Sequence, residues 1–559
     1  MLRQFAKRRF RRPAQSAKTQ REKLQCGLTD SDVPSKVPRV KPQFILPLAV
    51  LSGVLYFLGF IGFDQWYLEW IALAPLIVAL EHIETGRRAF FVSWLMGWVT
   101  HLGGYYWVVH LLTVFAFLPL PLAVLGYVLL CLVQGGSLAV FGWLAWQLKR
   151  TTGLALGWIA PVALIATEFA YPLIFQSYTA NSQAWMPVLI QIVDLGGVLL
   201  LSGVIALVNG AVAEYAISVI RRQRIRIALP AVAFVALAAT VIYGVVRMPQ
   251  IDARDAAAPK LKVVVVQANV GEADKLEKVN EGIEKYRTMT DIALTTPNIG
   301  LVVWPESGFN TLVALNADLT GHVATRIDTP MLVGAVRAEP VPDAERKGPE
   351  QYRVWNSILA IAPGGRAIAS YDKVKLLIFG EYLPGYETFP AFYESLRDAG
   401  ILPYISVFAR GQSFAPLPVG PYRISADVCY EDILPRHIRN LMGPIDSNGT
   451  RPHAMFNGTN DSWYGPVEPR IHLALSIFRA VEHRRWLIRS TATGISAFID
   501  ANGRIVRQSD FEKAETLTRD VPMISAGPTV YGRIGDLLGW LALLAVTVGV
   551  FVRHRATRH

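Results

Sequence analysis

The chain has 559 residues, of which 52% are hydrophobic and 18% charged, with a formal net charge of +12 and a mean hydropathy of +0.32. That average is too apolar for a purely soluble protein of this length and indicates a chain with membrane-spanning segments. A nucleic-acid-binding protein would need a basic face interleaved with aromatic residues on its soluble part, and the sequence has no such stripe.

The first 248 residues divide into a basic arm and a series of apolar blocks. Residues 1–43 carry no apolar run of the kind that a cleaved signal peptide has. Over 44–248, and again at 535–553, the apolar blocks approach or exceed the roughly 20 residues that cross a bilayer as a helix. We therefore expect seven spans before a soluble segment and one after it. The expected spans lie near 45–63, 67–82, 88–108, 119–147, 153–176, 188–218, 227–247 and 535–552.

Basic residues predict how these spans are oriented. With seven spans and then one, five basic clusters fall on the same side, whereas the opposite loops 63–66 and 176–185 contain no Lys or Arg. Because loops rich in Lys and Arg stay in the cytoplasm, we expect both termini there and the segment 256–527 on the other face. The clusters are Arg3–Arg12, Arg87–Arg88, Lys149–Arg150, Arg221–Arg226 and Arg553–Arg558.

The segment 256–527 has an ordinary globular composition in which strand and helix patterns alternate, which predicts an α/β layered fold. The turn Ala501-Asn502-Gly503 between two β-rich runs also predicts a hairpin. Strands are expected at 261–268, 300–304, 331–336, 357–362, 423–429, 454–457, 486–490, 496–500 and 504–506, and helices at 275–294 and 471–484.

Three polar positions at strand ends are candidates for chemistry. Glu306 follows Val302-Val303-Trp304-Pro305, Lys373 and Lys375 are expected on one face of a strand, and Cys429 ends another strand. Each of them also has a non-catalytic interpretation when it is considered alone. Glu306 could be a carboxylate at a turn, the two lysines could belong to a charged edge strand, and Cys429 could be a buried structural cysteine. The other cysteines lie in the arm and in an expected span, so the sequence contains no disulfide framework.

Together these segments resemble the nitrilase, or carbon–nitrogen hydrolase, superfamily. The resemblance covers about 261–510 and implies an αββα sandwich with Glu306 as general base, Lys373 as catalytic lysine and Cys429 as nucleophile. It also implies supporting roles for Glu381, Tyr430, Glu431 and Trp463. Lys373 is chosen over Lys375 by its spacing to Glu381. The matching segments are Trp304-Pro305-Glu306, Tyr371–Glu381, Cys429-Tyr430-Glu431, Asn457–Gly465 and Arg479–Arg484.

With its expected spans, the whole chain resembles the apolipoprotein N-acyltransferase family. This resemblance implies a bacterial inner-membrane enzyme whose catalytic domain, 256–527, faces the periplasm. Such an enzyme moves a fatty acyl chain from a phospholipid, expected to be the sn-1 chain of phosphatidylethanolamine, to the amine of S-diacylglyceryl-cysteine on apolipoproteins. No cofactor or metal is expected. The chain departs from the family pattern at Asn269–Asp274 and at Ile378, where a proline is usual.

Two alternative functions are also compatible with the sequence. A membrane-tethered amidase would use the three candidate residues with water as the final acceptor. A non-catalytic scaffold would need none of them, although all three are present. The aromatic-rich segment Tyr382–Phe414 is interpreted as a lid at the bilayer surface, and an ordinary packed loop is the alternative.

Overall fold

A computed structural model describes residues 41–556 with several internal gaps. The gaps are 115, 117, 272–276, 343–351, 378–379, 384, 387, 399–407, 444–445, 447–448 and 463–464. Most of the arm 1–43, the supporting candidate Trp463 and part of the expected lid lie outside the described residues.

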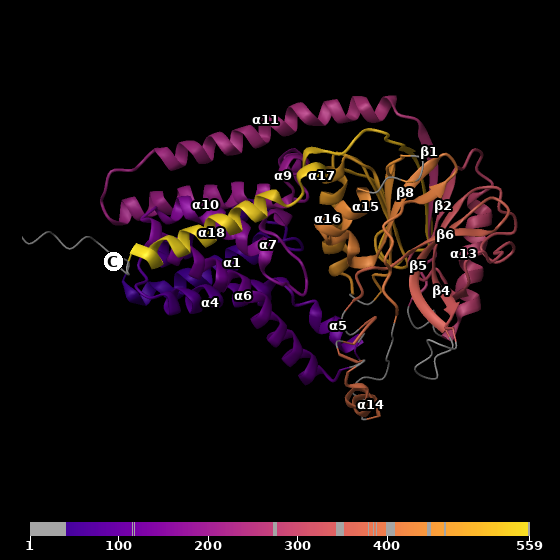
Figure 1. The fold of residues 1–559 in the computed structure, drawn as a ribbon, viewed down its shortest axis with the longest axis horizontal. Coiled ribbons are helices and arrows are strands. Elements are labelled where there is room, and N and C mark those ends of the chain that lie inside the picture. The colour runs from indigo at the N-terminus through magenta and orange to yellow at the C-terminus, as the bar shows by residue number, and fades with distance from the viewer. Residues whose placement is uncertain are drawn as a thin grey trace, which may run out of the picture.

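The N-terminal half is a bundle of helices that the last helix joins (Figure 1). Many of its outward-facing side chains are large and apolar, as with Phe234 and Leu544, which suits contact with lipid chains. The helices are α1 (Ile45–Gly59), α2 (Glu69–Ala72), α3 (Ala74–Leu80), α4 (Gly86–Gly104), α5 (Val108–Val114), α6 (Leu120–Thr152), α7 (Leu156–Ala170), α8 (Pro187–Ile190), α9 (Val193–Gly196), α10 (Val198–Ile220), α11 (Ala228–Ala257), α17 (Val530–Ile534) and α18 (Leu537–Ala556).

Each expected span contains helix, but the count of eight spans is not confirmed. Among the described residues, four helical segments are long and apolar enough to cross a bilayer: Pro42–Gly59, Leu120–Thr152, Val198–Ile220 and Ala228–Ala257. The expected span 153–176 is only α7, since Tyr171 precedes a proline and leaves the helical conformation. The expected span 188–218 is interrupted at Gly197, where φ is +69°.

The globular part is a sandwich of two sheets, as the sequence predicts. The first sheet has the order β13-β1-β2-β4-β5-β6 with β3 beside β4, and the second has the order β12-β11-β10-β9-β8-β7. The strands are β1 (Lys260–Gln267), β2 (Leu301–Val303), β3 (Phe309–Val313), β4 (Met331–Pro340), β5 (Tyr352–Ile361), β6 (Ala367–Asp372), β7 (Leu417–Val419), β8 (Tyr422–Val428), β9 (Ala454–Thr459), β10 (Leu487–Thr491), β11 (Ala497–Ile499), β12 (Ile505–Gln508) and β13 (Glu515–Pro522).

Alternating side chains divide the core into layers. In β1, Val263 and Val265 pack in one cluster with Ile488 of the opposite sheet, whereas Val264 and Val266 pack in another beneath α13 (Val279–Ala293). Figure 1 shows α13 on the outer side and α15 (Pro435–Met442) and α16 (Glu468–His483) between the sheets and the bundle. The result is the expected order helix, sheet, sheet, helix.

Local structure differs from the expectations in a few places. The strand before Lys373 ends at Asp372, so Lys373 and Lys375 do not share a strand face; Lys373 is buried and Lys375 exposed. Strands β3, β7 and β13 and helix α15 were not expected from the sequence. The hairpin at Asn502-Gly503 is confirmed, since β11 and β12 pair antiparallel on either side of it.

Buried charged contacts hold the two parts of the molecule together. Arg484, at the end of α16, donates from Nε to Asp194 Oδ2 of α9 at 2.8 Å and is 1% exposed. Trp486 Nε1 donates to Asp255 Oδ2 at 2.8 Å, because α11 continues past its expected end into the sandwich. The sandwich is thereby fixed to the end of the bundle.

Candidate functional site

Cys429 lies where β8 ends and a short 3-10 helix begins. Its backbone is left-handed, with φ +56°, a conformation that costs free energy for a residue other than glycine and recurs at functional sites. Asn457, on the parallel neighbour β9, holds this turn by donating to the Cys429 carbonyl at 2.9 Å and to Asp427 at 2.7 Å. The thiol-bearing residue is therefore fixed by the sheet itself and is 5% exposed.

Lys373 lies between the two carboxylates that the sequence also marks. Its Nζ is 2.9 Å from Glu381 Oε2 and 3.6 Å from Glu306 Oε1. Glu306 follows β2 and Lys373 follows β6, two strands of the first sheet that are separated by β4 and β5. Glu381 is held in turn by the backbone N–H of Leu377, at 2.9 Å. All three charged groups are buried, which strengthens their mutual interaction.

Asn356 also belongs to this cluster, although it is not among the site residues predicted from the sequence. From the buried part of β5, its Nδ2 donates to Glu306 Oε1 at 2.6 Å and to Glu381 Oε1 at 2.7 Å. A polar side chain shared by two carboxylates fixes their separation. The available signal was a lone amide at the start of the apolar run Ser357–Ile361.

Glu431 joins the turn that carries the cysteine to the segment that carries the lysine. Its carboxylate accepts hydrogen bonds from the backbone N–H groups of Val428, Val374 and Lys375, at 2.9, 2.9 and 2.7 Å, and from the hydroxyl of Tyr371 at 2.8 Å. These contacts connect the two sheets next to Cys429.

Tyr430 is the other supporting candidate whose contacts the structure describes. Tyr430 donates from its hydroxyl to the Leu376 carbonyl at 3.1 Å, and its ring centre lies 5.6 Å from Lys373 Nζ. This contact places an aromatic wall beside the lysine ammonium. Trp463 is outside the described residues, so its supporting role stays a prediction.

Burial and charge set the protonation states in this cluster. Burial and the charge of Glu306 hold the pKa of Cys429 well above its usual value, although Lys373 opposes them. Burial alone would lower the pKa of Lys373, but Glu381 and Glu306 outweigh it, and the lysine pKa is well above its usual value. At neutral pH the site thus holds a thiol and an ammonium, so the thiol must lose its proton to a base before it attacks.

A second buried polar cluster adjoins the turn and has the geometry of a cation site. Ligand atoms of Asp461, Glu468 and His472 lie within 4.8 Å of one another. Arg489 already supplies positive charge there, with contacts of 3.0 Å to Asp461 and 2.9 Å to Asp432. His472 bridges Asp432 and Asp461 at 2.8 and 3.2 Å. This network packs α16 against the turn of Cys429.

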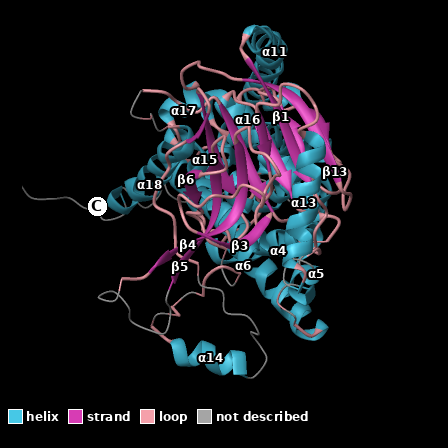
Figure 2. Ribbon diagram, turned by 90° about the vertical axis from the view of Figure 1, so that its right-hand side faces the viewer, coloured by secondary structure: helices cyan, strands magenta, loops and turns pink. Residues whose placement is uncertain are grey.

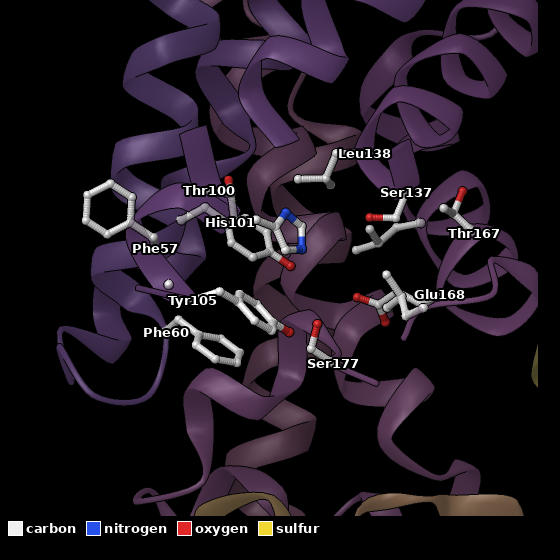
Figure 3. Close-up of a pocket in the computed structure, with 14 residues that line it drawn as sticks. Phe57, Phe60, Thr100, His101, Tyr105, Ser137, Leu138, Thr167, Glu168 and Ser177 are labelled. Atoms are coloured by element: carbon white, nitrogen blue, oxygen red, sulfur yellow. The ribbon is translucent and has the colours of Figure 1, made fainter. Parts of the chain in front are cut away.

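A small cavity of about 40 Å³ lies inside the helix bundle, at the end nearer the sandwich. Figure 3 shows His101, Tyr105 and Glu168 pointing into it. Glu168 Oε1 accepts from the backbone N–H and the hydroxyl of Thr179, at 2.7 and 2.6 Å. The volume suits a few water molecules, which such polar walls can hold.

A cysteine, a lysine and carboxylates gathered at strand ends of an αββα sandwich define the class: a carbon–nitrogen hydrolase domain attached to a membrane bundle. Residues 262–531 match the family model for carbon–nitrogen hydrolases, and residues 52–211 match that for the apolipoprotein N-acyltransferase N-terminal domain. The chain belongs to the apolipoprotein N-acyltransferase family.

Full-length relatives support this assignment. The chain is 30% identical to the apolipoprotein N-acyltransferase of Geobacter metallireducens, covering 92% of this chain and 96% of that one. It is 30% identical to that of Pseudomonas putida, with 89% and 96% covered, and 27% identical to that of Bdellovibrio bacteriovorus, with 90% and 93% covered. Together with the apolar helices, these relatives indicate a bacterial membrane enzyme, and neither the amidase nor the scaffold is favoured.

Proposed function

We propose that this protein transfers a fatty acyl chain from a membrane phospholipid to the N-terminal amine of S-diacylglyceryl-cysteine on apolipoproteins, through a thioester on Cys429. The observation that carries the mechanism is the ammonium of Lys373 held between Glu306 and Glu381 in the domain that presents Cys429. Family membership supports the acceptor, and the proposed donor is phosphatidylethanolamine, through its sn-1 chain.

In the first half-reaction, Cys429 Sγ attacks the ester carbonyl while Glu306 accepts the thiol proton. The Lys373 ammonium stabilises the oxyanion that forms, because a buried cation acts strongly on nearby negative charge. The C–O bond of the ester then breaks, and the leaving glycerol oxygen takes the proton from Glu306. The products are an acyl thioester and a lysophospholipid.

In the second half-reaction, the neutral α-amine of the diacylglyceryl cysteine attacks the thioester carbonyl. Glu306 accepts a proton from that nitrogen, the C–S bond breaks, and the proton returns to the Cys429 thiolate. The product is an amide, and the enzyme regains its starting state. Tyr430 and Trp463 would line the space around the thiol, and Glu381 and Glu431 would hold the lysine and the turn.

We propose a membrane arrangement that lets both lipid-anchored substrates reach the thiol. A cytoplasmic arm (1–43) leads into seven spans (44–248), the catalytic domain (256–527) lies on the periplasmic face of the inner membrane, and one span (535–553) returns the chain to the cytoplasm. The four long apolar helices and the shorter ones beside them support this arrangement. The basic clusters support cytoplasmic termini.

An assay with position-labelled lipids tests the donor and the acceptor together. Phosphatidylethanolamine carrying different chains at sn-1 and sn-2 would be incubated with the purified protein and a synthetic diacylglyceryl peptide. Mass spectrometry of the peptide should find the sn-1 chain as an N-terminal amide. The sn-2 chain on the peptide, or free fatty acid with unmodified peptide, would contradict the proposal.

A further inference from the structure

A cavity of about 370 Å³ lies at the junction between the catalytic domain and the helix bundle. The bundle contributes Phe169 near the end of α7, Leu199 in the first turn of α10 and Asp536 just before α18. The catalytic domain contributes Lys375 and Arg436. The lining thus combines apolar side chains from helix ends with cations from the sandwich.

The charged side chains that line this cavity carry more positive than negative charge. Arg436 Nε lies 3.0 Å from Asp536 Oδ2, and its guanidinium lies over the ring of Phe169, 5.3 Å from the ring centre. Lys375 is exposed to the cavity, and within the described part of the chain it has no ion-pair partner. Because Arg436 and Asp536 offset each other, Lys375 leaves the lining with a net positive charge.

The backbone adds donors on the same side. Leu434, Pro435, Arg436 and His437 of the lining are the cap and first turn of α15. The Leu434 N–H donates to the Glu431 backbone carbonyl at 3.1 Å and Pro435 has no N–H, so the first-turn donors are the N–H groups of Arg436 and His437. Free N–H groups in the first turn of a helix favour anions. His437 is 2% exposed and its Nδ1 has no partner, whereas its Nε2 contacts the Tyr371 hydroxyl at 3.0 Å. The catalytic-domain wall therefore combines positive charge with unpaired polar atoms.

The position of the cavity indicates where its ligand comes from. Three bundle helices, α7, α10 and α18, end or begin beside it on the side that meets the catalytic domain (Figure 1). The ends of membrane helices lie at the level of the lipid headgroups. A phosphate at that level belongs to a molecule whose acyl chains extend along the bundle, where Phe169 and Leu199 offer apolar contact.

The cavity is also joined to the candidate catalytic centre. Glu431 accepts from the backbone N–H of Lys375 at 2.7 Å and from that of Val428, the residue before Cys429, at 2.9 Å. His437 of the lining lies 3.4 Å from the same carboxylate. One buried side chain therefore holds both the cationic wall and the turn that carries the thiol.

We propose that this cavity binds the phosphodiester headgroup of the donor phospholipid, with Lys375 and Arg436 as its phosphate contacts. This inference rests on the proposed function, because it assigns a place to the donor of that reaction. Lys375 supplies the uncompensated charge, and Arg436 exchanges part of its pairing with Asp536 for the phosphate. The headgroup is thereby held beside the turn of Cys429.

Binding can be measured without catalysis. Native mass spectrometry of the Cys429→Ala protein would compare phosphatidylethanolamine, a diacylglycerol with the same chains, and inorganic phosphate. We expect the phospholipid to bind at least tenfold more tightly than the other two. Lys375→Gln should lower the affinity for phosphatidylethanolamine about tenfold. Lys375→Arg should keep most of the wild-type affinity, as expected for a charge-assisted contact with phosphate. Arg436→Gln should also weaken binding.

Arg326→Gln is the matched control, since Arg326 is an exposed arginine of the same domain, paired with Asp328 at 3.2 Å. It should leave phospholipid binding unchanged. Equal binding of phospholipid and diacylglycerol, or unchanged binding by Lys375→Gln and Arg436→Gln, would overturn the inference. Inorganic phosphate binding as tightly as the lipid would also overturn it, because the site would then take a free anion.

The catalytic readout separates this inference from the proposed function. In protein that retains Cys429, Lys375→Gln should raise KM for the phospholipid about tenfold and leave kcat within about twofold. A wild-type protein that never forms a thioester would contradict the proposed function, while the binding comparison in Cys429→Ala would still decide the role of the cavity. An unchanged KM beside normal thioester formation would contradict the cavity alone.

Discussion

The side-chain amide of Asn356 donates a hydrogen bond to Glu306 at 2.6 Å, from a strand next to β6, which ends at Asp372, one residue before Lys373. Because the same amide also bonds Glu381, Asn356 sets the distance between the proposed base and the carboxylate that pairs with Lys373. We expect Asn356→Ala to slow thioester formation roughly 10- to 100-fold, the effect of losing a hydrogen bond to a charged group.

The measurement for Asn356→Ala is the single-turnover rate of thioester formation by quenched intact-mass analysis. Asn280→Ala, which changes an exposed asparagine of α13, should keep the wild-type rate. If Asn356→Ala also reacts at the wild-type rate, Asn356 does not position Glu306.

Glu431 should make thermal stability depend on pH. Burial raises the pKa of Glu431 to about 7, against the opposing effect of Lys373. A carboxyl group with a raised pKa in the folded state binds its proton more tightly folded than unfolded, so the melting temperature should fall as pH rises from about 4.5 to about 7. Glu431→Gln should flatten that part of the curve. The check is a set of melting curves in detergent, and parallel wild-type and variant curves would be inconsistent with this pKa.

The buried pair between Arg484 and Asp194 should hold the catalytic domain on the bundle. Arg484→Ala leaves the Asp194 charge buried and short of one partner, so we expect a loss of about 3–5 kcal/mol. Asp194→Asn in the same chain should recover part of that loss. Melting curves and limited proteolysis of the two variants provide the measurement. Equal stability of wild type and Arg484→Ala would mean that the domains are held by other contacts.

The exposed phenylalanines around α14 (Pro390–Asp398) should contact the lipid surface. Phe389 is 64% exposed and Phe392 57%, and Figure 2 shows α14 standing apart from both sheets. Replacing both with serine should lower acyl transfer from vesicles several-fold, because apolar side chains anchor such helices in the interface. Ile292→Ser, at an equally exposed apolar position on α13, is the control. Equal rates for the double variant and the control would count against the contact and against the expected lid.

The sequence predicted the parts of the site that lie at strand ends. Glu306, Lys373 and Cys429 each follow a strand, and a strand's end is visible as an apolar run that stops at a polar residue. Cys429 and Glu431 could be paired with the other segments only through the family resemblance. No local pattern indicates that Glu431 would reach the backbone of Lys375.

The parts that escaped prediction depend on tertiary structure. Asn356 lies within a strand, where an amide is equally compatible with an exposed face, and only the fold turns it toward two carboxylates. Asp432, His472 and Arg489 come from three separate segments of the chain. No fixed spacing in the sequence therefore indicates that they form ion pairs. The break at Gly197 lies inside a run that is apolar on average despite Gln191 and Asp194, and average hydropathy therefore predicts one longer span.

Intact-mass analysis of the protein after incubation with phospholipid tests the central claim most directly. We expect one fatty acyl adduct, mapped to Cys429 and removed by hydroxylamine, that disappears when a diacylglyceryl peptide is added. Cys429→Ser and Glu306→Gln should show no thioester, while their melting temperatures remain close to that of the wild type. The absence of an adduct on Cys429, together with full acyl transfer by Cys429→Ser, would contradict the thioester mechanism.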